Sequence, residues 1–272
     1  METDIKKKIV KNWFKILQDV ICYDIEEIEK KTKKFTSTEW QRNKNKDEGG
    51  GEFRILENGK VFDKVGVNFS EVYGKFSKEF RKKIPGASLN PNFWASGISV
   101  VMHMKNPHVP AMHFNTRYVF TSHGWFGGGI DLTPIYVNKK LAVNFHQKLK
   151  SLCDRYNKSM YAQFKKGADD YFYVPHRNES RGIGGVFFDH FSENDILDKE
   201  QILSFCLDLG KLFPELYEDQ ILNAIELNGM NRQWQLLRRS RYVEFNLLHD
   251  RGTKFGIYSG GRTESILLSM PP

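Results

Sequence analysis

Three features that would assign a protein class at once are missing from this 272-residue sequence. No run approaches the roughly 18 consecutive apolar residues of a membrane span. No apolar segment follows the charged N-terminus, as it would in a secretory signal peptide. The only cysteines, Cys22, Cys153 and Cys206, lie far apart and form no CxxC pair. We therefore expect reduced core cysteines, no integral membrane segment and a cytoplasmic location.

Several catalytic motifs are absent as well. The sequence contains neither the GxSxG motif of serine hydrolases nor the HExxH motif of zinc proteases. Lys and Arg outnumber Asp and Glu by 41 to 33, but they lack the helix and aromatic-strand patterns of nucleic-acid binders. We therefore expect no nucleic-acid partner, and the charge excess favours an acidic small molecule.

The hydrophobic pattern predicts one domain over residues 1–272. Residues 1–40 are predicted to form an N-terminal helix, because Ile5, Ile9, Trp13 and later apolar residues recur at helical spacing. The polar, glycine-ending segment 41–52 is predicted to be a mobile loop. Strands are expected at 53–56, 61–67, 98–104, 111–120, 129–136, 171–174, 186–189 and 243–247, and further helices at 138–166, 195–213 and 215–229. The hairpin-like spacing predicts an α+β fold, with a large, mostly antiparallel β-sheet flanked on both sides by helices.

Polar residues alternate along two of the predicted strands. Ser99 and His103 share one face of the first strand, and His113, Asn115 and Arg117 share one face of the second. The second set places an acid or base, an amide and a guanidinium side by side. Because the flanking residues are apolar, this pattern favours a functional site over an ordinary solvent face.

Glycine and arginine dominate the remaining candidate segments. Residues 125–134 carry three glycines before Asp131, which favours either a tight turn or close approach of a flat ligand to the backbone. Arg177, Arg181 and Arg262 also lie beside glycines, away from the solvated helices. Because a guanidinium matches a carboxylate in a two-point contact, these arginines predict a substrate with several carboxylates.

At these segments the chain resembles the oxygen-dependent coproporphyrinogen III oxidase family. The matching stretches are EGGGEFR at 48–54, GVNFS at 66–70, HFNTRY at 113–118, WFGGGIDLTP at 125–134, HRNESRGIGGVFFD at 176–189, RGTKFG at 251–256 and SGGRTESILLSMPP at 259–272. They follow one another in family order from about residue 48 to the last residue.

The resemblance implies an enzyme of haem synthesis that converts two propionates of coproporphyrinogen III to vinyl groups. The reaction uses O2 as co-substrate and yields protoporphyrinogen IX, CO2 and H2O2. The resemblance also implies a homodimer through about Tyr242–Pro272 and no organic cofactor. A divalent metal has been claimed for some bacterial members, and the sequence leaves this open.

The resemblance also assigns roles to individual residues. His113 becomes the acid/base group, and Asp131 the catalytic carboxylate that faces the pyrrole nitrogens. The implied substrate contacts are Ser99, Asn115, Arg117, Gly260, Gly261 and Arg262, and we add Arg177 and Arg181 as candidate propionate anchors. The histidines implied as metal ligands are His103, His113, His146 and His176.

The chain departs from the family pattern at a short Tyr118–Trp125 link, at His190 and at His249. Two other classes of function stay open at this point. One is a metal-dependent oxygenase that uses His103, His113 and Asp131. The other is a porphyrin-binding carrier with the same arginines.

Overall fold

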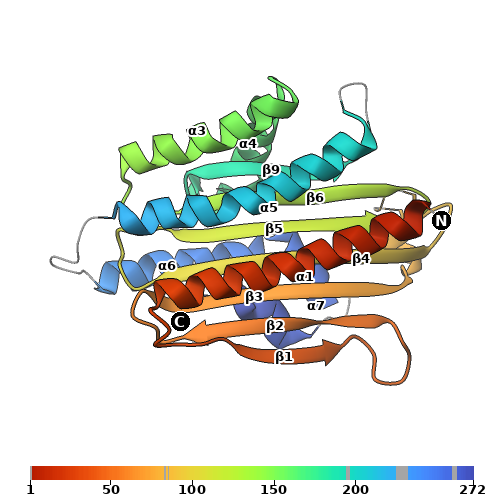
Figure 1. Ribbon diagram of the computed structural model, residues 1–272, viewed down its shortest axis with the longest axis horizontal. Helices are drawn as coiled ribbons and strands as arrows, with labels where there is room; N and C mark the ends of the chain where they lie inside the picture. Colours follow the sequence, from red (N-terminus) through yellow and green to blue (C-terminus); the bar gives the residue numbers. More distant parts are fainter. Residues whose placement is uncertain (1, 83, 85, 194–196, 225–231, 259–261) are drawn as a thin grey trace.

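The fold centres on one large antiparallel sheet (Figure 1). In the computed structural model, the described residues are 2–82, 84, 86–193, 197–224, 232–258 and 262–272. Seven strands pair in the order β1–β2–β3–β4–β5–β6–β9, and every pair in this sheet is antiparallel. The predicted α+β class with a mostly antiparallel sheet is therefore confirmed.

The elements have the following bounds. The sheet contains β1 Thr36–Gln41, β2 Gly49–Glu57, β3 Phe62–Lys75, β4 Asn92–Met104, β5 Ala111–Phe120, β6 Gly124–Thr133 and β9 Gly184–Phe191, and a separate pair contains β7 Tyr173–Val174 and β8 Glu179–Ser180. The helices are α1 Glu2–Ile28, α2 Lys78–Arg81, α3 Lys139–Tyr156, α4 Met160–Tyr171, α5 Lys199–Leu222, α6 Arg232–Leu248, α7 Arg251–Tyr258 and α8 Thr263–Ile266, with 3-10 turns η1 Pro175–Arg177 and η2 Leu267–Ser269.

The two faces of the sheet are covered differently. In Figure 1, α1, α3 and α5 lie in front of the sheet, and α6 and α7 lie behind it. The core fills the space between the front helices and the sheet, where Phe14 and Leu17 of α1 meet Val67, Val100 and other buried side chains. We call the opposite side, toward α6 and the C-terminal turn η2, the rear face.

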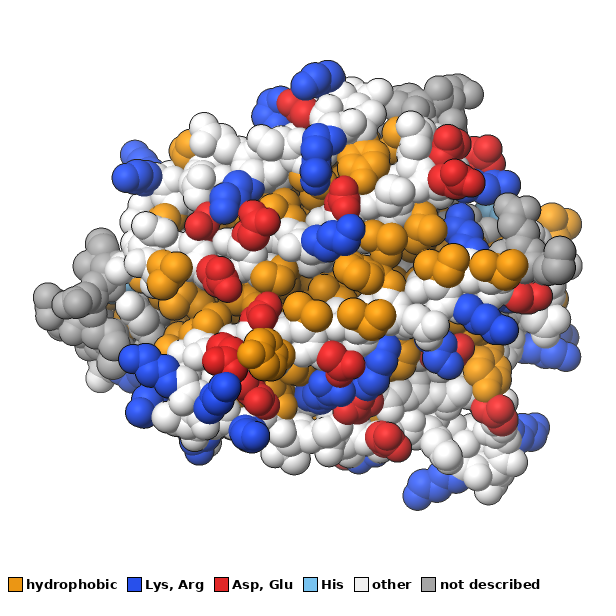
Figure 2. All heavy atoms as spheres, viewed as in Figure 1, with side chains coloured by type: hydrophobic (Ala, Val, Ile, Leu, Met, Phe, Trp, Pro, Cys, Tyr) orange, Lys and Arg blue, Asp and Glu red, His pale blue; other side chains and the backbone are white. Residues whose placement is uncertain are grey.

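The predicted apolar face of the first helix was only partly correct. Val10, Phe14, Leu17 and Ile21 are buried, but Ile5, Ile9, Ile16 and Val20 of the predicted stripe remain exposed. Figure 2 shows hydrophobic side chains at the surface of this side of the molecule, among lysines and acidic residues. Apolar residues occupy both sides of α1, so periodicity alone did not identify which side meets the sheet.

The predicted boundaries in residues 1–52 were wrong. The helix ends at Ile28, and Lys30 and Lys31 adopt left-handed backbone conformations with φ of 54° and 57°. Residues Thr36–Gln41 then form the edge strand β1 instead of continuing the helix. The glycines that closed the predicted loop belong to β2, where Gly50 pairs with both Gln41 and Glu71. Sheet pairing therefore overrides the loop-like composition of this segment.

The C-terminal half contains three further differences. The predicted helix 138–166 is two helices, which separate after Tyr156. The sequence predicted one helix that ends at residue 213 and a second that begins at 215. In the structure, α5 continues through Pro214 to Leu222. The predicted strand 243–247 lies inside α6, whose buried residues follow helical spacing. Five alternating residues were too short a pattern to separate a strand from a helix.

Candidate active site

The rear face of the sheet brings the predicted site residues into neighbouring rows. Register alignment places Ser99 opposite Asn115, Asn115 opposite Gly129, and His113 opposite Asp131. The next row contains Gly51, Ser70, Gly97, Arg117 and Gly127. Successive strands lie about 4.8 Å apart, so this row of small side chains around Arg117 spans roughly 19 Å from β2 to β6. A platform of that width suits a broad, flat ligand.

A chain of hydrogen bonds runs along β5 beside this row and ends at β6. Arg117 Nη1 donates to Asn115 Oδ1 at 3.4 Å, and Asn115 Nδ2 lies 3.1 Å from His113 Nε2. His113 Nδ1 lies 2.8 Å from Asp131 Oδ1, and Arg181 Nη2 donates to Asp131 Oδ2. The ionised carboxylate can only accept, so Nδ1 carries the imidazole proton and Nε2 is left as an acceptor. The arrangement defines one tautomer for His113 and turns its basic nitrogen toward Asn115.

Asp131 and Arg181 form a buried ion pair at one end of this chain. Asp131 is 2% exposed and Arg181 is 6% exposed. Burial alone would raise the pKa of Asp131, but the attraction of Arg181 and the contact with His113 hold it below its usual value. The Arg181 guanidinium in turn lies 4.1 Å from the ring centre of Phe172 and 4.8 Å from that of Tyr242. The rings hold the guanidinium in place, and the charge of Arg181 keeps Asp131 ionised despite its burial.

Arg117 lies at the more open end of the chain. Its side chain is 37% exposed, and its Nη2 donates to Asp189 Oδ1 at 2.8 Å. A Cβ atom at Gly127 would lie 2.7 Å from Nη2 of this guanidinium, so a larger residue there would push Arg117 from its present position across β6. The glycine-rich segment 125–134 therefore forms a strand that accommodates a neighbouring arginine, which decides against the tight-turn alternative.

Comparison with known proteins identifies the family. The family model described as coproporphyrinogen III oxidase matches residues 9–272. The chain belongs to this family. Oxygen-dependent coproporphyrinogen-III oxidases of Rickettsia rickettsii (strain Sheila Smith) and Rickettsia conorii (strain ATCC VR-613 / Malish 7) are each 48% identical over 276 residues, covering 98% of this chain and 96% of the relative. That of Rickettsia bellii (strain RML369-C) is 47% identical over the same shares.

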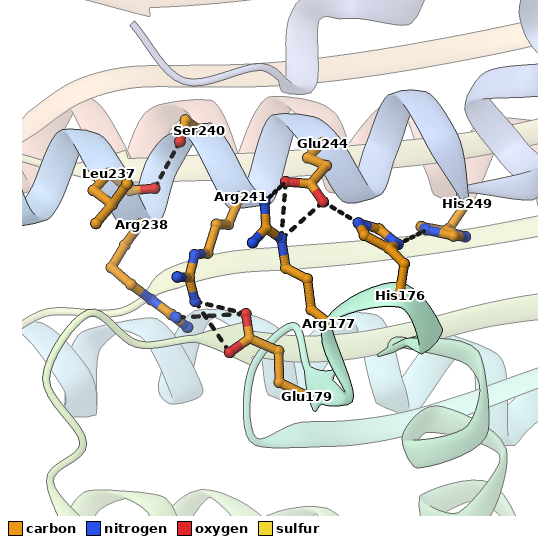
Figure 3. A network of polar contacts seen from close by, with 9 residues as sticks. All are labelled: His176, Arg177, Glu179, Leu237, Arg238, Ser240, Arg241, Glu244 and His249. Atoms are coloured by element: carbon orange, nitrogen blue, oxygen red, sulfur yellow. Dashed lines mark hydrogen bonds and ion pairs between the residues drawn. The ribbon is translucent and has the colours of Figure 1, made fainter.

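Arg177 lies in a separate exposed network that joins the loop after β7 to α6 (Figure 3). Its Nη2 donates to Glu244 Oε2 at 2.6 Å, and His176 Nε2 contacts the other oxygen. His249 Nε2 lies 3.1 Å from His176 Nδ1, and the two rings stack. The hydrogen bonds from Arg177 and His176 lower the pKa of Glu244 to about 2. Thus Arg177 and Arg181, four residues apart, contact different carboxylates in different surroundings.

The four histidines implied as metal ligands have separate partners. His103 is buried with its Nε2 2.8 Å from Ser269 O, and burial lowers its pKa to about 3. His146 Nε2 lies 3.1 Å from Ile183 O, and burial lowers its pKa as well. Within the described part of the chain, no three His, Cys, Asp or Glu side chains form a group that could hold a metal ion. The described histidines therefore do not fit a shared metal centre.

The C-terminal segment covers part of the rear face. A Cβ atom at Gly66 would lie 2.4 Å from Cγ of Leu268, so this turn packs directly against β3. Arg262 lies over the ring of Phe53 on β2, at 5.5 Å from its centre. The predicted substrate contacts Gly260 and Gly261 lie outside the described residues.

Asp250 was not among the site residues predicted from the sequence. Tyr171 Oη donates to its Oδ1 at 2.7 Å, and the Thr253 N–H donates to its Oδ2 at 2.6 Å. Burial would raise the pKa of Asp250, but these hydrogen bonds and the nearby His113 lower it. Helix α6 and the turn into α7 bring this carboxylate toward the site, which no local motif could indicate.

The departures from the family pattern have local structural explanations. The short link after Tyr118 is a tight hairpin, in which Phe120 pairs with Gly124. His190 adopts a left-handed φ of 52° and packs edge-on against Trp125 at 4.7 Å. Among the described interactions, neither the short link nor His190 contacts Asp131 or His113. These two departures therefore leave the central chain of hydrogen bonds intact.

Proposed function

We propose that this chain catalyses the oxygen-dependent oxidative decarboxylation of coproporphyrinogen III to protoporphyrinogen IX, with O2 as co-substrate. The observation that carries the proposal is the buried Arg181–Asp131 pair, joined through His113 and Asn115 to the half-exposed Arg117. It sets charged and proton-transferring groups at one end of a wide platform of small side chains. That arrangement suits a large macrocyclic substrate with several carboxylates.

The overall chemistry defines what the protein must supply. Each propionate, O2 and one proton give a vinyl group, CO2 and H2O2. The substrate side chain loses CO2, one β-hydrogen as a proton and two electrons, and O2 accepts the two electrons and two protons. One further proton per decarboxylation must therefore reach the oxygen. His113 can move that proton at Nε2, because Asp131 stabilises the protonated ring through Nδ1.

The substrate carboxylates need positive partners. Arg117 and Arg262 are each more than one-third exposed, at 37% and 38%, so both can exchange their present carboxylate partners for a propionate. Arg177 is also accessible, although Glu244 now holds it. We assign Arg181 a different role, because it is buried and committed to Asp131. It positions the catalytic carboxylate and keeps it ionised.

We infer a homodimer that uses the C-terminal helices. Large apolar side chains remain exposed on α6 and α7, namely Leu236, Leu237, Leu247, Leu248 and Ile257, each 45–54% exposed. Such a set on adjacent elements is typical of a protein interface. It overlaps the segment of about Tyr242–Pro272 for which the family resemblance implies dimer contacts. Sedimentation of the native chain against a Leu237→Glu/Leu248→Glu variant tests this inference.

We also propose that no organic cofactor takes part and that the protein works in the cytoplasm. The three cysteines are buried and unpaired, as is usual in a reducing compartment. No helix in the described ranges has the length and hydrophobicity needed to cross a bilayer. The electron-rich porphyrinogen can itself supply the electrons that reduce O2.

An anaerobic mixing experiment tests the proposed function. Chelator-treated protein is mixed with coproporphyrinogen III under nitrogen, and O2 is then added. We expect protoporphyrin among the products after chemical oxidation, detected by fluorescence, only in the samples that received O2. Product that forms only after a divalent metal is restored would support the metal-dependent oxygenase instead. Binding without any product would support the carrier.

A variant at His113 tests the proton-transfer role. His113→Gln keeps a side chain that can hydrogen-bond but removes the basic nitrogen. We expect kcat to fall by on the order of 10²–10³-fold with little change in KM, because the proton step is lost while substrate contacts remain. A near-native kcat would contradict the role.

A further inference from the structure

One polar side chain on the rear face has no assigned role. Asn68 of β3 pairs across the strands with Ser99 on one side and Phe53 on the other. Its neighbours Val67 and Phe69 point into the core, so the amide lies on the rear face. Its Oδ1 is buried and has no hydrogen-bond partner among the described residues. An unpaired buried acceptor weakens the folded state, which suggests that a ligand uses this amide.

Asn68 lies between the two accessible arginines. Arg117 comes from β5, and Arg262 lies over Phe53 of β2. The strands between Phe53 and the backbone of Arg117 are β3 and β4, which carry Asn68 and Ser99 at opposed positions. The Arg117 guanidinium itself reaches over β6 toward Asp189, so the two positive charges lie about four strand spacings, or roughly 19 Å, apart. A macrocycle held at its rim by both arginines therefore has its centre over β4, at Ser99 with Asn68 beside it.

The centre of a porphyrinogen presents pyrrole N–H groups, which require hydrogen-bond acceptors. Both oxygens of Asp131 already accept from His113 and Arg181, and Asn115 Oδ1 already accepts from Arg117. Each carboxylate oxygen of Asp131 keeps a second lone pair, but Asp131 lies on β6, away from the middle of the platform. The amide oxygen of Asn68 on β3 and the hydroxyl of Ser99 on β4 add acceptors nearer the middle.

We propose that Asn68 binds the substrate, its amide oxygen accepting a pyrrole N–H beside Ser99. The residue as a whole is only half-buried. A rotation of about 180° at the end of its side chain needs nearly the same volume, turns the oxygen to the platform and places Nδ2 in the buried position. This inference rests on the proposed function, and it adds recognition of the reduced ring to recognition of its carboxylates.

Two variants and two ligands test the proposal. Asn68→Leu keeps the shape and removes both polar groups, whereas Asn68→Asp keeps acceptor oxygens and removes the donor. Coproporphyrinogen III under nitrogen offers four pyrrole N–H groups, and zinc coproporphyrin III offers the same carboxylates but no N–H. Dissociation constants are measured by tryptophan fluorescence quenching. Asn92→Leu, at the exposed start of β4, is the matched control.

For Asn68→Leu we expect about a 10-fold weaker affinity for the porphyrinogen, the effect of one lost hydrogen bond. The affinity for the zinc complex stays within about twofold, and Asn68→Asp stays within about threefold for the porphyrinogen. The melting temperature of Asn68→Leu is equal to or above that of the native chain, because an unpaired acceptor has been removed. KM rises with the dissociation constant while kcat is nearly unchanged.

Other outcomes overturn the proposal in distinct ways. If Asn68→Leu binds the porphyrinogen as tightly as the native chain does, Asn68 does not contact the ring. If its melting temperature falls and both ligands bind more weakly, the residue has a structural role. If the native chain binds neither ligand, the proposed function itself fails.

Discussion

Replacing Arg181 with Met isolates the energetic role of the buried ion pair. The substitution preserves most of the side-chain volume among Phe172, Tyr242 and Phe245 but removes the charge next to Asp131. Both members of the pair have side chains that are only 3% exposed. Because one charge would be left buried without its partner, we expect the free energy of unfolding to fall by about 3–5 kcal/mol. For a chain of this size, that lowers Tm by on the order of 10 °C.

The neighbouring arginine supplies a matched control. Arg177 also forms an ion pair, with Glu244, but its side chain is 38% exposed. Removal of an exposed pair costs about 1 kcal/mol or less, so Arg177→Met should change Tm by only a few degrees. Both variants are compared by urea unfolding at pH 8, followed by circular dichroism. Equal losses for the two variants would refute the assignment of Arg181 to a buried structural pair.

The pH dependence provides a second check on the same reasoning. In the native chain, the lowered pKa of Asp131 adds stability above the unfolded pKa of about 3.9, and that stability disappears as the pH falls through the folded pKa. In Arg181→Met, burial acts without the opposing charge and raises the pKa of Asp131. The ionised form then costs more stability as the pH rises. We therefore expect the deficit of the variant to be smaller at pH 5 than at pH 8, and an unchanged deficit would contradict the argument.

Three further variants test the fold around the site. Glu29→Ala removes a buried carboxylate that accepts hydrogen bonds from the backbone N–H groups of residues 60–62. We expect the free energy of unfolding in urea to fall by about 2–4 kcal/mol, and to fall less in Glu29→Gln. Phe114→Ala empties a fully buried position stacked on Phe213 and should cost about 3–5 kcal/mol by the same measurement. Gly66→Ala places its Cβ against Leu268, so the C-terminal turn must shift. We expect faster proteolysis of residues after 258 and a higher KM, and unchanged digestion would show that the turn does not pack there as described.

Local sequence patterns were sufficient for several of the antiparallel strands, although not for the edge strand β1. The Asn58-Gly59 turn joins β2 to β3, and the alternation in residues 111–120 predicted β5 with its exact bounds. Alternation also placed His113, Asn115 and Arg117 on one face, because side chains in a strand repeat every two residues. The polar face therefore followed from the sequence alone.

Patterns that were ambiguous between helix and strand needed tertiary contacts to be decided. Residues 243–247 alternate like a strand but belong to α6, where Phe245 is buried beside Phe172 and Tyr171. Pro214 looked like a helix end, but α5 continues through it while packing on the sheet core. In both segments, burial against distant residues outweighs the local preference.

The sequence by itself determined the family, the antiparallel sheet and the identity of most charged groups in the site. Only the tertiary structure decided which of those groups are bound to each other. Arg177 and Arg181 look equivalent in sequence, yet one is exposed against Glu244 and the other is enclosed with Asp131. The reason is physical: pairing and burial depend on which distant strands and helices meet, and these contacts set the charge state and accessibility of each group.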